Sequence, residues 1–272
     1  MMSNFMQKYR YSLILLKELV ITEFKLRYQG SFLGYLWSLL RPLFLFVILY
    51  FVFVYFLRIG SDIPHWPVAM LLGIVLWNFF SEVTNNGLTS IVNRGDVIRK
   101  INFPKYVILL AGSVSALINL LLNLLVITVF MWINQVDLSW SALLSPLYII
   151  EIFIFALGLS FILSAVFVKL RDMNYIWEII MQALFYASAV IYPIAMVMER
   201  SVTMAQVILL NPVAQAIQDV RQTLIYDQTP TLSSISGGNV WISLTPIALV
   251  VVVFIFGAWF FKKKSPSFAE NV

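Results

Sequence analysis

Six long apolar runs dominate this sequence of 272 residues. At a rise of about 1.5 Å per residue, a helix of about 20 residues crosses the roughly 30 Å hydrocarbon layer of a bilayer. Hydrophobic residues make up 61% of the chain and charged residues 11%, whereas soluble domains average about 45–50% and 25%. The continuous Leu, Ile, Val and Phe runs lack the alternation of β-barrel strands. We therefore predict an all-α, polytopic membrane protein with six transmembrane helices, at residues 34–57, 66–91, 105–133, 142–168, 174–197 and 241–261.

The cations alternate between the two sides of these predicted spans. Fifteen of the 18 Lys and Arg residues fall in segments on one side, at residues 1–41, 94–105, 169–171 and 262–264. Only Arg58, Arg200 and Arg221 lie on the other side. By the positive-inside rule we predict that the N- and C-termini are both cytoplasmic. The net charge of +5 then reflects topology, and we expect no nucleic-acid partner.

Residues 1–30 precede the first span, and charged residues scattered through them argue against a cleavable signal peptide. Five apolar side chains in this segment follow helical spacing: Tyr9, Leu13, Leu16, Val20 and Phe24. We predict a cytoplasmic N-terminal amphipathic helix lying in the membrane interface. A helix packed on the spans without touching lipid is the alternative. The transmembrane domain then covers residues 31–262, and residues 263–272 form a cytoplasmic tail.

Arg41 and Pro42 interrupt the first apolar run. A charge within lipid costs at least about 2.5 kcal/mol, so Arg41 should have water or a partner beside it. We interpret Arg41 as a cation facing a wet cytoplasmic cavity, with an arginine snorkelling to the inner interface as the alternative. Pro42 has no backbone N–H and predicts a kink near residue 38.

The connection from 198 to 240 is too apolar in its first half for a solvated loop. Residues 202–210 and 213–225 each have about half the length of a span, and Asn211 and Pro212 separate them. The residue before proline is disfavoured in helical geometry. We therefore predict two re-entrant half-helices, at about 202–225, dipping into the outer leaflet before the last span.

Catalytic chemistry is sparse in this chain. Cysteine is absent and His65 is the single histidine, which excludes disulfides, thiolate metal sites and His-rich metal sites. No glycine is followed by Lys-Ser or Lys-Thr, so the chain has no phosphate-binding loop for hydrolysing ATP alone. Glu82, Glu151 and Glu178 are isolated carboxylates. We expect no catalytic residue, metal site or cofactor in this chain.

The connection between the second and third spans, residues 93–104, mixes cations with apolar residues. Val97, Ile98, Ile101 and Phe103 have the spacing of a short amphipathic helix. Such a helix suits docking into a groove on a soluble partner. A simple positively charged loop is the alternative.

Aromatic residues make up 15% of the chain, more than interfacial belts require. Flat, non-ionic rings contact the C–H groups of sugars without tight directional bonds. Such contacts suit a polymer that must bind and then slide along the surface. Packing or lipid contact is the alternative for these rings. Our candidates for such a sliding surface are Phe53, Trp77, Phe80, Phe185, Tyr186 and Tyr192.

Five stretches, in order along nearly the whole chain, carry a family resemblance. They are residues 24–37 (FKLRYQGSFLGYLW), 99–104 (RKINFP), 170–172 (LRD), 190–193 (VIYP), and Asn211-Pro212 with Arg221. Together they resemble the permease subunit of ABC-2 polysaccharide exporters, the group that includes O-antigen, capsule and wall teichoic acid export. One departure is Ala189, since the family often has proline after the serine that corresponds to Ser188.

The resemblance implies a homodimer in a bacterial inner or plasma membrane, with two copies of a separate nucleotide-binding subunit that holds ATP and Mg. The permease itself is not catalytic, and the assembled complex is an ATP-hydrolysing translocase. The resemblance also implies a coupling helix on the ATPase, here Arg94, Asp96, Val97, Arg99, Lys100, Ile101, Phe103 and Pro104. By the same resemblance the half-helices form an outer gate that includes Asn211, Pro212 and Arg221. It also implies that the first, second and fifth spans line the conduit.

Our hypothesis is export of a polyprenyl-diphosphate-linked glycan or teichoic acid, driven by closure of the ATPase against residues 93–104. Arg27, Arg41 and Lys100 are our candidates for attracting the diphosphate. An ABC-2 exporter of small molecules or drugs is one alternative. An intramembrane prenyl-phosphate sugar transferase is another, although it needs clustered acidic residues or a metal site.

Overall fold

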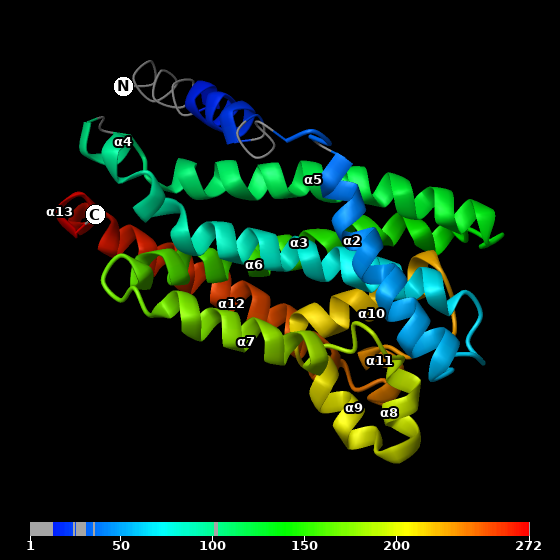
Figure 1. Cartoon of the computed structure of the whole chain (residues 1–272). Coiled ribbons are helices and arrows are strands. Elements are labelled where there is room, and N and C mark those ends of the chain that lie inside the picture. The colour runs from blue at the N-terminus through cyan, green and yellow to red at the C-terminus, as the bar shows by residue number, and fades with distance from the viewer. Residues whose placement is uncertain (1–12, 24, 26–30, 35, 101–102, 272) are drawn as a thin grey trace.

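The computed structural model describes residues 13–23, 25, 31–34, 36–100 and 103–271. Every regular element within these ranges is helical (Figure 1), as the apolar runs predict. Residues 13–23 are helical. The later elements are α2 (Leu36–Leu49), η1 (Tyr50–Phe56), α3 (Trp66–Asn93), α4 (Gly95–Lys100), α5 (Tyr106–Ile133), η2 (Trp140–Leu144), α6 (Ser145–Phe167), α7 (Met173–Ala187), α8 (Ile194–Arg200), α9 (Val202–Leu209), α10 (Pro212–Leu224), α11 (Leu232–Ile235), α12 (Val240–Lys264), η3 (Ser265–Ser267) and α13 (Phe268–Asn271).

Five helical stretches in the described part of the chain are long and apolar enough to cross a membrane. They are Leu36–Phe56, Trp66–Asn93, Tyr106–Ile133, Trp140–Phe167 and Val240–Glu270. They correspond to the first four predicted spans and the sixth. The structure therefore supports a multi-pass helical bundle with five spans of full length.

Residues 174–197, which we predicted as one span, do not form one helix. α7 has 15 residues and ends at Ala187, which is short of the 20 or so residues needed to cross the hydrocarbon layer. The chain then turns, with Ala189 at a φ of +49°, and α8 begins after Pro193. A left-handed residue and a proline cannot continue an α-helix. The break is thus present even though this chain has Ala189 where the resembling family often has proline.

The two short helices predicted before the last span are present as α9 and α10. Asn211 separates them with a ψ of 119°, outside the helical region, and its side chain accepts a hydrogen bond from the Val213 backbone N–H. This is the effect of Pro212 on the residue before it. The dipping of α9 and α10 into an outer leaflet stays a prediction.

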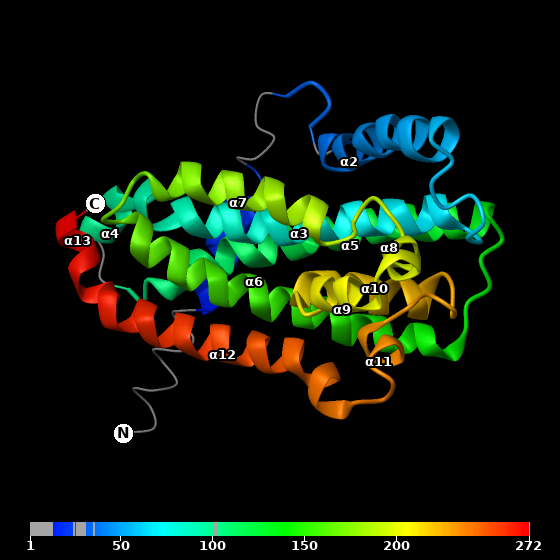
Figure 2. The same cartoon turned by 90° about the horizontal axis from the view of Figure 1, so that it is seen from below.

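α3 is the centre of the bundle and packs against α5 and α6, while α6 packs against α12. Figure 2 shows α7 and α12 on opposite sides of this centre. Small residues permit the close helix contacts: a Cβ on Gly87 would collide with Ser160, and a Cβ on Gly158 would lie 2.8 Å from the backbone of Phe254. The Ser160 hydroxyl donates across the first contact to the Val83 carbonyl at 3.0 Å.

One end of the bundle, which we call the α4 end, carries α4 and α13 together (Figures 1 and 2). Beneath its surface lies an apolar cluster drawn from six helices and the loop after α4, which we call the α4-end cluster. Its principal members are Ile91, Ile98, Phe103, Ile108, Phe161, Phe261 and Phe268. Lys105 donates to the Ser265 carbonyl, and burial lowers the pKa of this lysine. The C-terminal segment is therefore part of the packed structure at this end.

The helix at 13–23 packs on the α4-end cluster through Leu15 and Leu19, while Leu13 and Ile14 are exposed. The packing face thus differs from the predicted stripe, because Leu15 and Leu19 lie off it. Glu23 forms an ion pair with Arg94, with Oε1 and Nη2 2.8 Å apart. Tyr9 and Phe24 of the predicted stripe lie outside the described residues.

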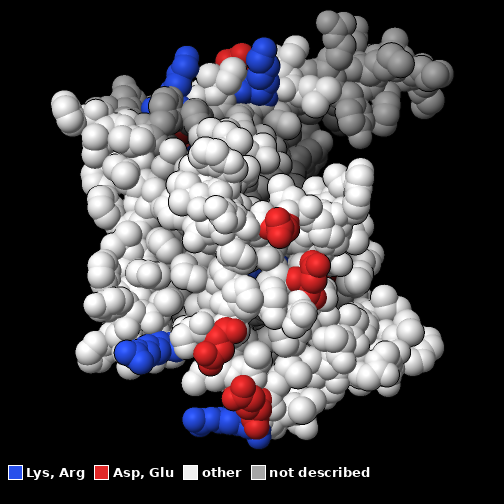
Figure 3. All heavy atoms as spheres, turned by 90° about the vertical axis from the view of Figure 1, so that its right-hand side faces the viewer, with Lys and Arg blue, Asp and Glu red and all other residues white. Residues whose placement is uncertain are grey.

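The opposite end of the bundle, which carries α8, α9 and α11, is shown in Figure 3. White, uncharged atoms dominate this face. The exposed charges in its helices and connections are Arg58, Asp62, Asp137, Glu199, Arg200 and Asp227. Among these described residues the acidic side chains outnumber the basic ones, which is the reverse of the α4 end.

Candidate functional site

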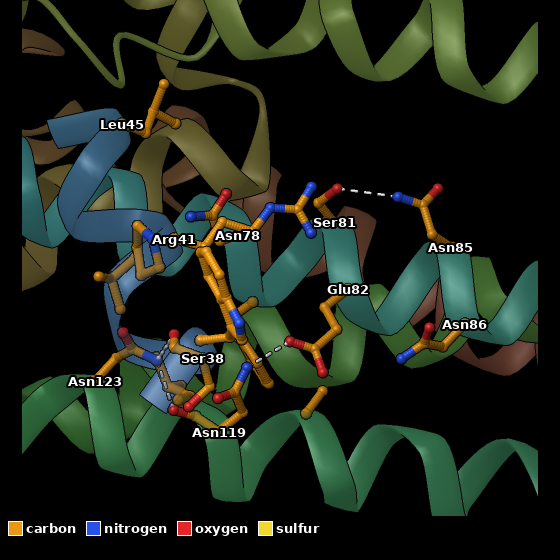
Figure 4. Close-up of a pocket in the computed structure, with 16 residues that line it drawn as sticks. Ser38, Arg41, Leu45, Asn78, Ser81, Glu82, Asn85, Asn86, Asn119 and Asn123 are labelled. Carbon is orange, nitrogen blue, oxygen red and sulfur yellow. Dashed lines mark hydrogen bonds between the residues drawn. The ribbon is translucent and has the colours of Figure 1, made fainter. Parts of the chain in front are cut away.

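A polar cavity of about 860 Å³ lies between α2, α3 and α5, within helices that are otherwise strongly apolar. Figure 4 shows its side chains converging from these three helices. Five of the lining residues are asparagines. The lining consists of Trp37, Ser38, Arg41, Pro42, Leu45, Val75, Asn78, Phe79, Ser81, Glu82, Asn85, Asn86, Ala116, Asn119, Leu120 and Asn123.

α3 supplies most of the polar wall. Asn78, Ser81, Glu82, Asn85 and Asn86 are spaced by three and four residues, so they fall on one face of the helix. The other faces of α3 are buried in the bundle. A single membrane-length helix therefore carries an apolar packing surface and a hydrophilic stripe.

α5 closes the wall opposite α3 with two asparagines one helical turn apart. The Asn119 Nδ2 donates to Glu82 Oε2 at 2.9 Å. The Asn123 Nδ2 donates to the Asn119 carbonyl at 2.9 Å and to the Ser38 carbonyl at 3.3 Å. These hydrogen bonds fix the orientation of both amides and join the three helices (Figure 4).

The bond from Asn123 to Ser38 follows from the proline in α2. In an α-helix the N–H of residue 42 would bond the carbonyl of residue 38, and Pro42 has no N–H. Pro42 therefore does not donate to the Ser38 carbonyl, which accepts from Asn123 of α5. Pro42 and Ser38 are both buried on the side of α2 that lines the cavity, so α2 joins the site at residue 38, and the predicted kink there stays a prediction.

Arg41 lines the cavity, as its interpretation as a cation facing a wet cavity requires. The other two candidates for a diphosphate site are not beside it. Lys100 is exposed on α4, and Figures 1 and 2 place α4 and α2 in different parts of the bundle. Arg27 lies outside the described residues. The two described candidates, Arg41 and Lys100, therefore do not form one cluster.

The six candidate aromatics are divided by the structure. Trp77 and Phe80 are buried at 6% and 0% exposure and pack in the bundle, Trp77 against Phe80 at 5.6 Å and against Phe185 at 5.7 Å between ring centroids. Trp77 and Phe80 line a separate, smaller apolar cavity of about 290 Å³. None of the six lines the polar cavity.

The remaining candidate aromatics are more open. Phe53, Phe185 and Tyr192 are half-buried, whereas Tyr186 is 62% exposed. The Tyr192 hydroxyl donates to the Tyr186 carbonyl at 2.8 Å across the break after α7. Tyr186 is thus the candidate with the most surface available to another molecule.

The three residues predicted for an outer gate all lie in or just before α10. Arg221 is buried at 1% exposure, and its guanidinium donates to three backbone carbonyls. Its Nε reaches Ala69 at 2.9 Å, Nη1 reaches Ala189 at 2.8 Å, and Nη2 reaches Val190. The guanidinium carbon also lies 5.1 Å from the ring centroid of Trp66. Arg221 therefore ties α10 to the start of α3 and to the break after α7.

Asn211 adds a second connection to this break, because its Nδ2 donates to the Ser188 Oγ at 2.9 Å. Pro212 is buried. Glycine is required at residue 73 because a Cβ there would collide with the Arg221 guanidinium. The gate candidates thus act as internal anchors of the break between α7 and α8.

The predicted coupling segment forms α4 and the residues after it. Its exposed side chains are Asp96, Arg99 and Lys100, and the Arg99 Nη2 lies 2.8 Å from the Asp96 Oδ1. Arg94 pairs with Glu23, Val97 and Pro104 are half-buried, and Phe103 is buried at 7% exposure. Ile101 lies outside the described residues. The exposed face of this segment is therefore charged, and Phe103 is buried in the bundle.

Sequence analysis missed the amide wall of the cavity. The signal was present as the spacing of Asn78, Ser81, Glu82, Asn85 and Asn86 in one apolar run, with Asn119 and Asn123 in the next. Glu82 was interpreted as an isolated carboxylate, whereas the structure gives it Asn119 as a partner.

Comparisons with known proteins agree with this architecture. The sequence profile of the family described as ABC-2 type transporter matches residues 14–225. The O-antigen export system permease protein RfbA of Myxococcus xanthus is 29% identical over 95% of each chain. A Klebsiella pneumoniae protein of the same name is 31% identical over 77% of this chain and 81% of its own. The polysialic acid transport protein KpsM of Escherichia coli is 23% identical over 66% of this chain and 70% of its own.

Proposed function

The chain belongs to the ABC-2 transporter family and is a multi-pass membrane protein, and from this premise we propose that it is the permease subunit of a polysaccharide exporter. The relatives named for O-antigen export and polysialic acid transport support this assignment. The cargo in this proposal is a cell-surface glycan carried on a polyprenyl diphosphate. It moves from the cytoplasm to the outer face of the membrane.

The observation that carries the proposal is the polar cavity between α2, α3 and α5. Polar and ionisable side chains inside a membrane are costly and usually mark a substrate path. This cavity holds five asparagines, Arg41 and Glu82 within helices of high mean hydropathy. A hydrophilic wall of this size suits a polymer rich in hydroxyl groups.

The energy for transport comes, in this proposal, from a separate nucleotide-binding subunit that holds ATP and Mg. Its docking site is the exposed face of α4, made by Asp96, Arg99 and Lys100. The α4 end then faces the cytoplasm, which agrees with the positive-inside rule because the cations gather there.

A second copy of the chain completes the conduit, and each copy has its own ATPase partner. α2 lines the cavity, but few of its side chains are buried within this chain, which leaves a face of α2 for the second copy. Movement of α4 by the ATPase is passed to α3, which directly precedes α4 in the chain and carries the polar wall. Rigid-body rotation of packed helices is a common form of such coupling.

In this proposal Arg41 binds the diphosphate at the start of transport. Substitution of Arg41 by alanine tests this role. The chain is coexpressed with its ATPase subunit and reconstituted in proteoliposomes containing a polyprenyl-diphosphate-linked glycan. We expect Arg41→Ala to lower the stimulation of ATP hydrolysis by the lipid-linked glycan about tenfold, since one charge-assisted contact is lost.

The matched control is Arg58→Ala, which removes an exposed arginine outside the cavity and should leave the stimulation unchanged. Equal stimulation in wild type and Arg41→Ala contradicts the role of Arg41. Absence of any stimulation by the lipid-linked glycan in wild type contradicts the proposed function itself.

A further inference from the structure

Two carboxyl groups meet where α10 packs on α6 (Figure 2), and neither lines the polar cavity. Glu151 of α6, an isolated carboxylate in the sequence, lies beside Asp219 of α10. The Gln215 amide, one helical turn before Asp219, connects the two. Its Nε2 donates to the Asp219 Oδ2 and lies within reach of the Glu151 carboxyl group. A carboxyl–amide–carboxyl cluster therefore joins the two helices.

This cluster is largely removed from solvent. Gln215 is 5% exposed and Asp219 9%, while Glu151 is half-buried. Tyr148, one turn before Glu151, is also half-buried and lies near both carboxyl groups. Glu151 belongs to the membrane-length stretch Trp140–Phe167, and an ionised carboxylate at such a position is costly unless a partner balances its charge.

No cation balances the two carboxyl groups within the described part of the chain. Arg221 shares α10 with Asp219, but its guanidinium is directed to three backbone carbonyls. The other ionisable side chains on elements packed against α6 or α10 line the polar cavity, are exposed, or lie in the last turn of α12: Glu82, Tyr106, Tyr175, Glu178, Tyr186 and Lys262–Lys264. Two adjacent carboxylates repel each other strongly in a medium of low dielectric constant.

The cluster also lacks hydrogen-bond donors. Glu151 Oε1 and Gln215 Oε1 are both buried and have no hydrogen-bond partner in the described chain. A carboxylate has acceptors only, whereas a protonated carboxyl group gains one O–H donor. One proton therefore removes one of the two negative charges and supplies one missing donor. A proton needs no open cavity, and the half-buried Glu151 gives it a route from the surface.

We propose that Glu151, Asp219 and Gln215 form a proton-binding site, in which the two carboxyl groups share one proton and so hold α10 against α6. The site lies outside the polar cavity and does not depend on the exporter function proposed above. α10 carries Arg221 and begins after Asn211, and both residues hold the break after α7. Release of the proton therefore weakens the support of that break.

Infrared spectroscopy of the purified full-length chain detects the shared proton directly, because a protonated carboxyl group and a carboxylate have different C=O stretching bands. Wild type at neutral pH should show a protonated-carboxyl band that is absent from the double variant Glu151→Gln with Asp219→Asn. In each single variant the remaining carboxyl group has lost its negative neighbour. Its band should therefore disappear at a pH at least about one unit lower than in wild type.

Thermal unfolding provides a second measurement. Carboxyl groups of an unfolded chain ionise near about pH 4, so above that pH the unfolding of wild type releases the shared proton. The stability of wild type should therefore fall as the pH rises. Between about pH 5 and about pH 8 we expect the wild-type Tm to fall by about 3 °C or more relative to that of either single variant.

The matched control is Glu199→Gln, which neutralises an exposed carboxyl group on α8 and should keep the wild-type band and pH profile. A wild-type spectrum equal to that of the double variant over this pH range overturns the inference. So does a pH profile of Tm that neither single variant changes. A wild-type Tm that rises with sodium concentration, without the band, shows a bound metal cation in place of the proton and also overturns it.

The two single variants test the pair separately, so the other decides if one of them does not fold. Neither measurement uses a glycan or the ATPase subunit. Failure of this inference therefore leaves the exporter function standing, and failure of the exporter function leaves this inference standing.

Discussion

The two ends of this molecule use arginine in opposite ways. At the α4 end, Arg99 lies on the surface with 54% of its side chain exposed and pairs with Asp96, which is 82% exposed. Toward the opposite end, Arg221 is 1% exposed and donates to three backbone carbonyls. A solvated ion pair contributes little to stability, whereas a desolvated guanidinium with its acceptors cannot be removed without leaving buried polar groups unpaired.

Each end is suited to its proposed task. The α4 end is held by apolar packing beneath a charged surface, so a partner can bind the surface without disturbing the core. At the opposite end the hydrogen bonds of Arg221 and Asn211 run directly to the break after α7. Any movement of α10 must therefore involve that break.

Loss of Arg221 should give the largest effect on stability. Arg221→Ala leaves the buried Ala189 and Val190 carbonyls without their donor, each costing about 1–3 kcal/mol, and empties a buried site, so we expect a loss of at least about 3 kcal/mol. Thermal unfolding of the purified protein in detergent measures it. Arg200→Ala, which removes an exposed arginine from α8, should leave Tm almost unchanged.

Substitution of Gly73 provides a second thermal-unfolding test of the Arg221 contacts, because a Cβ at this position collides with the Arg221 guanidinium. Gly73→Ala should lower Tm strongly in the wild-type background and much less in Arg221→Ala. Additive effects of the two substitutions would mean that the collision is not the reason for glycine at residue 73.

Phe268→Ala should have the next largest effect and should act locally. The Phe268 ring is 1% exposed and packs on Phe261, with 5.2 Å between centroids. Its removal costs about 3 kcal/mol of packing, the lower end of the range for a buried phenylalanine. The tail should therefore detach, and α4, which α13 contacts, should lose this contact. We expect faster amide hydrogen exchange in α4 and weaker copurification of the ATPase subunit.

Glu270→Ala is the control for the tail, because this side chain is exposed beside Phe268. It should leave hydrogen exchange and copurification as in wild type. Unchanged exchange of α4 in Phe268→Ala would show that the tail does not support the coupling segment.

Loss of Glu23 should give the smallest effect. Glu23 and Arg94 are each about one-fifth exposed, and pairs that reach solvent contribute less than about 1 kcal/mol. Glu23→Gln should therefore lower Tm slightly at low salt, with the difference from wild type shrinking at high salt as the pair is screened. An effect as large as that of Arg221→Ala would remove the contrast between the two ends.

The position of Phe103 illustrates where sequence reasoning stops. Its spacing with Val97, Ile98 and Ile101 predicted an amphipathic helix that docks through an apolar face. In the structure Ile98 and Phe103 are buried against the bundle, and the outward face is charged. Periodicity identifies two faces of a helix, but it does not say which face meets the partner, because both the bundle and a second protein can cover apolar side chains.

The helical class could be predicted from the sequence alone, as could the five full-length spans of the described residues and the division of α9 from α10 at Asn211. These follow from local causes: the length of apolar runs in lipid and the effect of Pro212 on the residue before it. Three hydrogen bonds could be found only in the tertiary structure. Asn123 donates to the Ser38 carbonyl, Asn119 donates to Glu82, and Arg221 donates to the Ala189 carbonyl in the break after α7. The residues joined by these hydrogen bonds are 85, 37 and 32 positions apart in the sequence. Their meeting depends on how whole helices pack, which no local pattern encodes.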